Sequence, residues 1–82
     1  MTEEEFQLAI EQFLERHKLT PTTFGLWAMN DSRFVWDVRN GRRCFGSTMR
    51  RVIDFMAAYE AKMEARRLRL EALATAVKKE DA

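Results

Sequence analysis

Hydrophobic side chains near the start of the chain recur every three or four residues, which is the spacing of one face of an α-helix. The set comprises Phe6, Ile10, Phe13 and Leu14. Thr2 and Glu5 form a capping box at the head of this pattern, and the neighbouring glutamates suit the positive end of a helix dipole. The pattern therefore predicts an amphipathic helix over residues 2–17 that packs over the rest of the domain.

A second helical pattern opens at Thr20, whose hydroxyl is suited to cap the free amides of a first turn. Pro21 follows at the first helical position, where its missing N–H costs nothing. The pattern breaks at a Met-Asn-Asp run that ends at Asp31. Gly25 lies in the middle of this short helix and costs it about 0.5 to 1 kcal/mol relative to alanine, which indicates a close contact. We expect the next helix to cross at this glycine, beneath Val35.

The third pattern covers residues 32–40, with Asp31 as its N-cap. Gly41 ends it by accepting the left-handed conformation that a helix C-terminus needs. The core side of this helix carries Val35 and Val38. Residues 19–43 thus hold two short helices joined by a short turn, which is the layout of a helix-turn-helix.

The two tryptophans of this stretch have different surroundings. Trp27 lies near Phe24 and Met29 at a spacing typical of a core residue, so we expect it to be buried. Trp36 lies on the side of the second helix opposite the core positions. That side also carries Arg33, Asp37 and Asn40. A tryptophan among charges either contacts a partner or packs against the N-terminal or the C-terminal helix, and the sequence leaves both open.

No glycine or proline interrupts residues 47–79, which are rich in good helix formers. A helix of that length spans about 45 Å and exceeds the width of so small a domain. It carries a stripe at alternating intervals of three and four: Met49, Val52, Met56, Tyr59, Met63, Arg66, Leu70, Leu73 and Val77. The early part of this stripe is expected to close the core, and the late part to form a dimer surface.

We assign dimerisation to the late hydrophobic residues of the stripe, Met63, Leu70, Leu73 and Val77. A parallel pair would oppose Arg66 with its own copy and bring Lys62 near Arg67, which is unfavourable. An antiparallel pair avoids this, as does a helix broken near residues 60–66 and folded back. A second stripe, Ala58, Ala61, Ala65, Leu68 and Ala72, is compatible with either arrangement.

The 82 residues predict one small all-α domain of four to five helices with a long C-terminal helix. We divide the chain into a helix-turn-helix domain over residues 1–58 and a C-terminal helical extension over residues 59–82. A domain of this size has a thin core, so help from dimerisation is expected.

Residues 19–43 resemble the phage-repressor-like (lambda-repressor-like) helix-turn-helix family. The matching positions are Leu19-Thr20 at the start, Phe24-Gly25 in the first helix, Val35 and Val38 in the second, and Asn40-Gly41 followed by Arg42-Arg43 at its end. The registration needs no gap. The resemblance implies a sequence-specific transcriptional regulator that binds double-stranded DNA and whose second helix enters the major groove.

Local charge agrees with this implication. The formal net charge is only +1, but residues 1–15 carry five glutamates and no lysine or arginine, whereas residues 33–51 carry six arginines against one aspartate. A basic segment of this kind is the electrostatic signature of nucleic-acid binding.

The family geometry places the start of the second helix nearest the base edges. The base contacts it implies are Ser32, Arg33, Trp36 and Asp37. Arg33 suits the two acceptors of guanine, and Asp37 suits the amino group of cytosine. The implied phosphate contacts are Thr22, Thr23, Asn40, Arg42, Arg43 and Arg50. One such helix reads too few base pairs to single out a site, so a homodimer with two helices about 34 Å apart is expected.

The runner-up function is a protein-interaction module. In this alternative the aromatic side chains of Phe34 and Trp36 dock polymerase or another regulator. Salt discriminates the two, because binding to phosphates weakens steeply as salt rises and aromatic docking does not.

Composition argues against other classes. One histidine, His17, and one cysteine, Cys44, supply neither a zinc ligand set nor a nucleophile with its base, so we expect no enzyme, metal or cofactor. We interpret Cys44 as a small loop residue, and the alternative interpretation is a redox-sensing thiol. The acidic start differs from a signal peptide, and no apolar run approaches the ~20 residues of a membrane span. A cytoplasmic location without membrane contact is expected.

Overall fold

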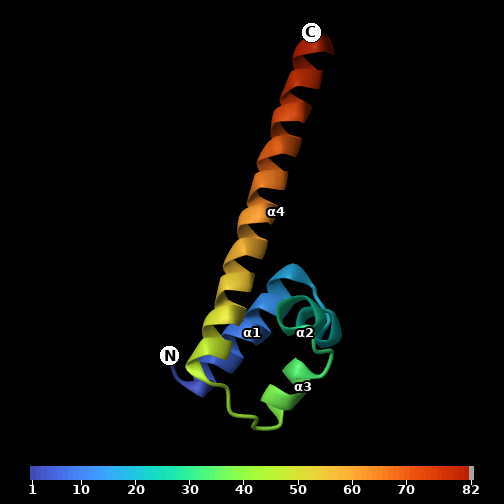
Figure 1. Cartoon of the computed structure of the whole chain (residues 1–82). Helices are drawn as coiled ribbons and strands as arrows, with labels where there is room; N and C mark the ends of the chain where they lie inside the picture. Colours follow the sequence, from blue (N-terminus) through green and yellow to red (C-terminus); the bar gives the residue numbers. More distant parts are fainter. Residues whose placement is uncertain (82) are drawn as a thin grey trace.

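The computed structural model describes the backbone of residues 1–81 and the side chains of residues 1–75. It has four helices, α1 (Glu3–His17), α2 (Pro21–Met29), α3 (Phe34–Arg39) and α4 (Gly46–Asp81), and no strand in that described part. The first three pack beside the start of α4, and the remainder of α4 extends beyond them (Figure 1). The all-α class with a long C-terminal helix is confirmed.

The predicted capping box begins α1. The Thr2 hydroxyl accepts a hydrogen bond from the Glu5 amide at 3.1 Å, and the Thr2 amide donates to the Glu5 carboxylate at 3.2 Å. Bonding to Thr2 lowers the pKa of the Glu5 carboxyl. Lys18 ends the helix in the left-handed conformation, with φ 53°. The helix buries Phe6, Ile10, Phe13 and Leu14, as its spacing predicted.

The predicted start of α2 is also confirmed. The Thr20 hydroxyl accepts a hydrogen bond from the Thr23 amide at 3.2 Å, and Pro21 occupies the first turn. Asn30 then takes the left-handed conformation, with φ 54°, and its amide donates to carbonyls of the last turn. Both ends of α2 are therefore set by residues adjacent to them in sequence.

The prediction that Asp31 caps the next helix is wrong. One Asp31 carboxylate oxygen accepts from the Arg33 amide at 2.9 Å, and the Phe34 amide donates to the Asp31 carbonyl at 3.2 Å. These bonds close a turn over residues 31–34, so α3 starts at Phe34 instead of residue 32. Arg33 occupies the cap position without a side-chain cap bond. Gly41 follows the helix with φ 94°, in the left-handed region predicted for it.

Gly25 makes a close contact, but with a different partner from the one expected. A Cβ at this position would lie 2.2 Å from the Asp31 carbonyl oxygen and 3.4 Å from the Phe34 Cβ. The Asp31 amide also donates to the Gly25 carbonyl at 3.1 Å. Glycine is therefore needed because the turn entering α3 passes directly over α2. The predicted crossing beneath Val35 is corrected to a crossing at Asp31.

The core lies between the four helices and contains Phe6, Ile10, Phe13, Leu14, Phe24, Ala28, Phe34, Val35, Val38 and Val52. Val35 and Val38 are buried as predicted. Phe34, the first residue of α3, is 0% exposed and belongs to this core. Trp27 was predicted to be buried and is 56% exposed. It stacks on Tyr59 at a centroid distance of 6.2 Å, so it covers the edge of the core from outside.

The last helix, α4, is continuous from Gly46 to Asp81, so the folded-back arrangement is wrong. Its first half packs on the core through the buried Val52 and the partly buried Tyr59. Residues 61–75 are all exposed. The division placed after residue 58 therefore falls within one turn of the point where α4 leaves the other helices.

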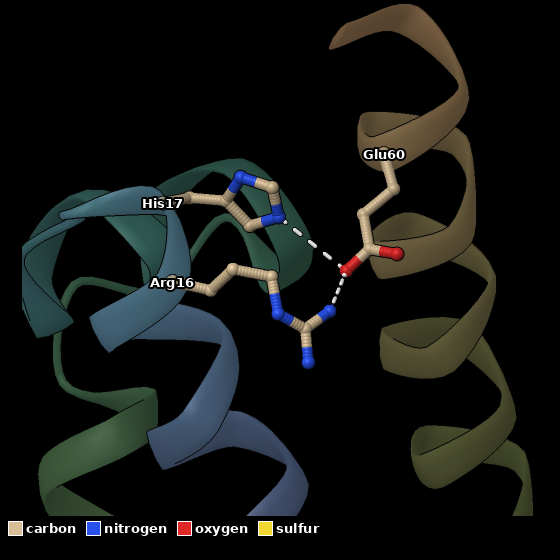
Figure 2. Close-up of polar contacts among 3 residues, drawn as sticks. All are labelled: Arg16, His17 and Glu60. Carbon is tan, nitrogen blue, oxygen red and sulfur yellow. Dashed lines mark hydrogen bonds and ion pairs between the residues drawn. The ribbon is translucent and has the colours of Figure 1, made fainter. Parts of the chain in front are cut away.

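One polar cluster marks that point (Figure 2). Glu60 of α4 accepts from the Arg16 guanidinium at 2.5 Å, and the same carboxylate oxygen lies 3.3 Å from Nε2 of His17. The His17 ring lies 4.5 Å from Phe13 and 5.0 Å from Tyr59, centroid to centroid. The C-terminal end of α1 is thus attached to α4 by ring packing and by ion pairing.

Candidate nucleic-acid interface

The exposed side of α3 is the side opposite its three buried residues, Phe34, Val35 and Val38. At about 100° per residue, Arg33, Trp36 and Asp37 fall on this side, and Ser32 precedes them in the turn. Asp37 is partly buried, and the other three are exposed. The four predicted base-contacting residues therefore share one end of the molecule, away from the free end of α4 (Figure 1).

Trp36 is 46% exposed and lies outside the core cluster. The guanidinium carbon of Arg39 lies 5.0 Å from its ring centroid, in cation–π geometry. The structure therefore leaves Trp36 half-exposed, with Arg39 against its ring. The indole rests on Arg39 and keeps a face available to a partner.

Arg39 is itself held by α1. Its guanidinium donates to both carboxylate oxygens of Glu11, at 2.8 and 2.6 Å. Bonding to Glu11 raises the pKa of Arg39. Bidentate pairing of this kind fixes the guanidinium plane, so Glu11 indirectly fixes the support of Trp36.

Sequence reasoning missed both Glu11 and Arg39. The Trp36–Arg39 contact has the i, i+3 spacing of neighbours on a helix, and this was the available signal. Glu11 is 28 residues from Arg39, and no local pattern connects the two.

Two further predicted DNA contacts are neighbours in the structure. The Arg42 guanidinium lies 3.5 Å from the Asp37 carboxylate and 3.6 Å from that of Asp31. Its guanidinium carbon also lies 5.6 Å from the ring centroid of Phe34. These side chains are 41 to 44% exposed, so the ion pairs are weak and exchangeable. Only Nη1 of Arg42 and one oxygen of each carboxylate take part in these contacts, so the other guanidinium nitrogens and the second Asp37 oxygen are not engaged by them.

The other predicted phosphate contacts differ in availability. Thr22 is exposed at the start of α2, whereas the Thr23 hydroxyl accepts from the Thr20 hydroxyl at 2.8 Å. Asn40 is exposed at the end of α3. Arg43 lies in the loop before α4 and Arg50 in its second turn, and both are exposed. Within the described side chains neither arginine forms an ion pair.

Cys44 lies half-buried in the loop between α3 and α4. Burial raises the pKa of its thiol, and nearby Arg42 offsets this in part. A protonated thiol is a poor nucleophile, which favours the loop-residue interpretation over the redox sensor. No group of three potential metal ligands occurs among the described residues.

The predicted dimerisation residues lie on the half of α4 that projects from the domain. Met63, Leu70 and Leu73 are exposed there, and the side chain of Val77 lies outside the described residues. By helical position this stripe continues the side of α4 that packs on the core through Val52.

None of the helices in the described part is long and apolar enough to cross a membrane. Comparison of the chain with family models, with curated proteins and with solved structures finds no match.

Proposed function

We propose that the protein is a sequence-specific DNA-binding transcriptional regulator of the phage-repressor-like helix-turn-helix type, acting in the cytoplasm as a homodimer. The observation that carries the proposal is the α2–turn–α3 unit. The turn lies on Gly25, which holds α3 at a defined angle to α2, and the residues exposed on α3 are suited to reading bases.

The chemistry of that exposed side supports DNA over other ligands. Ser32 and Arg33 precede the first turn of α3, the part of a recognition helix that comes closest to base edges. Arg33 has no ion-pair partner among the described side chains, so its guanidinium is free to donate twice to guanine. Trp36, supported by Arg39, offers a flat apolar surface to a thymine methyl group or a sugar.

The flanking residues supply phosphate contacts, which set register without reading sequence. Arg43 and Arg50 follow α3 on the loop and on α4, and Thr22 lies at the start of α2. Arg42 joins them through the guanidinium nitrogens that its two carboxylate contacts do not engage.

The alternative function is a protein-docking module, and only one of its two proposed docking residues, Trp36, is exposed. Phe34 is buried and cannot dock a partner without unfolding α3. The exposure of Trp36 alone favours this second function.

Selection of bound sequences from a random DNA pool, followed by a salt titration on the selected site, tests the proposal. We expect an enriched motif and a logarithmic salt slope of about −0.9 for each phosphate contacted. Recovery of no motif would refute sequence-specific binding. Tight association with another protein that is insensitive to salt and lost on Trp36→Ala would establish the docking module instead.

A further inference from the structure

The half of α4 that projects beyond the other helices carries basic and hydrophobic residues on one side. This side continues the one that Val52 and Tyr59 turn toward the core, and it is exposed throughout residues 61–75. Its residues, here called the basic face, are Lys62, Met63, Arg66, Arg67, Arg69, Leu70 and Leu73. At about 100° per residue, Glu64 and Glu71 fall outside the half of the helix that holds this face. The charges beside its three hydrophobic residues are therefore all positive.

The outward side of α1 carries the opposite charge. It lies opposite the side that α1 buries in the core, and its residues, here called the acidic face, are Glu4, Glu5, Leu8, Glu11 and Glu15. Leu8 is 57% exposed and has glutamates on both sides. Glu11 is engaged by Arg39, whereas Glu4 and Glu15 form no ion pair among the described side chains. The arginine at the edge of this face, Arg16, is already paired with Glu60.

The two faces of one copy do not meet each other. Phe13, on the buried side of α1, lies 5.4 Å from Tyr59 and 6.3 Å from Phe55, centroid to centroid. The α4 helix of the same copy therefore lies against the buried side of α1, and the acidic face points away from it. Because α4 is one continuous helix, its projecting half does not return to that face. In an assembly of this protein alone, a basic face reaches an acidic face only from a second copy.

Contact between the basic faces of two copies is unfavourable in either direction. Lys62, Arg66 and Arg69 would approach the same cations of the other copy, whether the helices run parallel or antiparallel. The described part of the basic face offers no carboxylate to separate them. Opposite charges meet when the basic face of one copy lies on the acidic face of the other, and this contact also covers the exposed Leu8 and Leu70.

We propose that the protein forms a two-fold dimer in which the basic face of α4 lies on the acidic face of α1 of the second copy. Leu8 packs among the hydrophobic residues of the basic face, while Glu4 and Glu15 pair with the cations beside them. Because each copy carries both faces, the contact is made twice around the two-fold axis. The residues assigned to dimerisation from the sequence, Met63, Leu70 and Leu73, keep this role but meet α1 instead of their own counterparts. The pairing rests on the homodimer part of the proposed function and is independent of its DNA-binding part.

Charge exchange in the full chain tests the contact, read without DNA as the dimer dissociation constant by analytical ultracentrifugation. The first variant carries Glu4→Lys and Glu15→Lys, and the second carries Arg66→Glu and Arg69→Glu. Each variant alone opposes like charges at both contacts, so each is expected to weaken pairing by about tenfold or more. An equimolar mixture of the two is expected to restore pairing, because every contact in the mixed dimer again joins opposite charges.

Glu71→Lys is the matched control, because Glu71 lies on α4 outside the basic face, and this change should not weaken pairing. Circular dichroism of each variant checks that the helices are retained. If the first variant pairs as tightly as the unaltered protein, α1 takes no part in the contact and the proposal is overturned. A mixture that stays monomeric while both variants remain helical would also overturn it. An unaltered protein that remains a monomer up to sub-millimolar concentrations would assign the basic face to another partner, and growth beyond the dimer would rule out the two-fold arrangement.

The salt dependence of pairing gives an independent test by its sign. Rising salt screens the attraction between the acidic and basic faces and should weaken pairing, whereas it would strengthen a contact between two basic faces. The two proposals also fail in distinguishable ways. A protein that passes the charge exchange but selects no DNA motif retains the pairing and loses the DNA function. A protein that selects a single half-site and sediments as a monomer retains the DNA function and loses the pairing.

Discussion

Gly25→Ala is the sharpest test of the helix-turn-helix geometry. The added methyl carbon would lie 2.2 Å from the Asp31 carbonyl oxygen, well inside van der Waals contact. That oxygen belongs to the backbone and accepts the Phe34 amide at 3.2 Å, and the Asp31 amide donates to the Gly25 carbonyl at 3.1 Å. The turn therefore has to move away as a unit, and α3 moves with it.

Two effects of opposite sign determine the size of the change. Replacing a mid-helix glycine by alanine gains about 0.5 to 1 kcal/mol of helix propensity. Overpacking typically costs about 1 to 3 kcal/mol, and weakening the two turn hydrogen bonds adds about 0.5 to 1.5 kcal/mol each. We expect a net loss of about 1 to 5 kcal/mol, with a fall in Tm of about 4 to 8 °C for each kcal/mol in a domain of this size.

Thermal and urea unfolding, followed by circular dichroism and by tryptophan fluorescence, measures this loss. Gly46→Ala is the matched control, because a Cβ at Gly46 meets nothing within 4 Å and the residue begins α4. We expect the control to leave stability unchanged or slightly raised. If Gly25→Ala is as stable as the control, the turn does not rest on α2 as described.

Three further predictions concern single side chains. Arg33→Ala should change which DNA sequence is preferred, with a loss of about 1 to 3 kcal/mol of discrimination between bases. Arg43→Ala should instead weaken binding to all sequences alike and reduce the salt slope by about one unit. Binding titrations on the selected site and on a scrambled site measure both effects. Glu11→Gln should cost about 0.5 to 1 kcal/mol, since the pair with Arg39 is about one-third exposed, and should loosen the indole beside that arginine, seen as lower tryptophan anisotropy without loss of fold. The thiol of Cys44 should react more slowly with a disulfide reagent at pH 8 than a free cysteine does, because its raised pKa keeps it protonated until higher pH; a rate equal to that of the unfolded protein would contradict this.

Local sequence determined the start of α1, the start of α2 and the end of α3. Thr2 with Glu5, Thr20 with Pro21, and Gly41 act on backbone groups within a few residues, so their effect does not depend on the rest of the fold. The hydrophobic spacing of α1 and the uninterrupted helix formers of α4 predicted those elements for the same reason. The all-α class followed from them.

The tertiary structure decided which side chains face outward in the two shortest helices. A helix of six residues, α3, makes fewer than two turns, so its pattern alone does not show that Phe34 is buried. Trp27 is exposed and stacks on the ring of Tyr59, a residue 32 positions later in the sequence, at the edge of the core. Position 25 requires glycine because the Asp31 carbonyl oxygen occupies the space that a Cβ would need.

In the candidate interface, too, some features followed from the sequence and others only from the fold. Arg33 and Trp36 were assigned to the exposed side from helical spacing, and they lie there. The ion pairs could not be read from the sequence, because the strength of a charge interaction depends on separation in space. The fold decides these separations for Arg39 with Glu11 and for Arg42 with Asp31 and Asp37. The sequence also left open the course of α4. In the structure α4 is one continuous helix, attached to α1 through Glu60 and Tyr59, and residues 61–75 beyond that attachment are exposed.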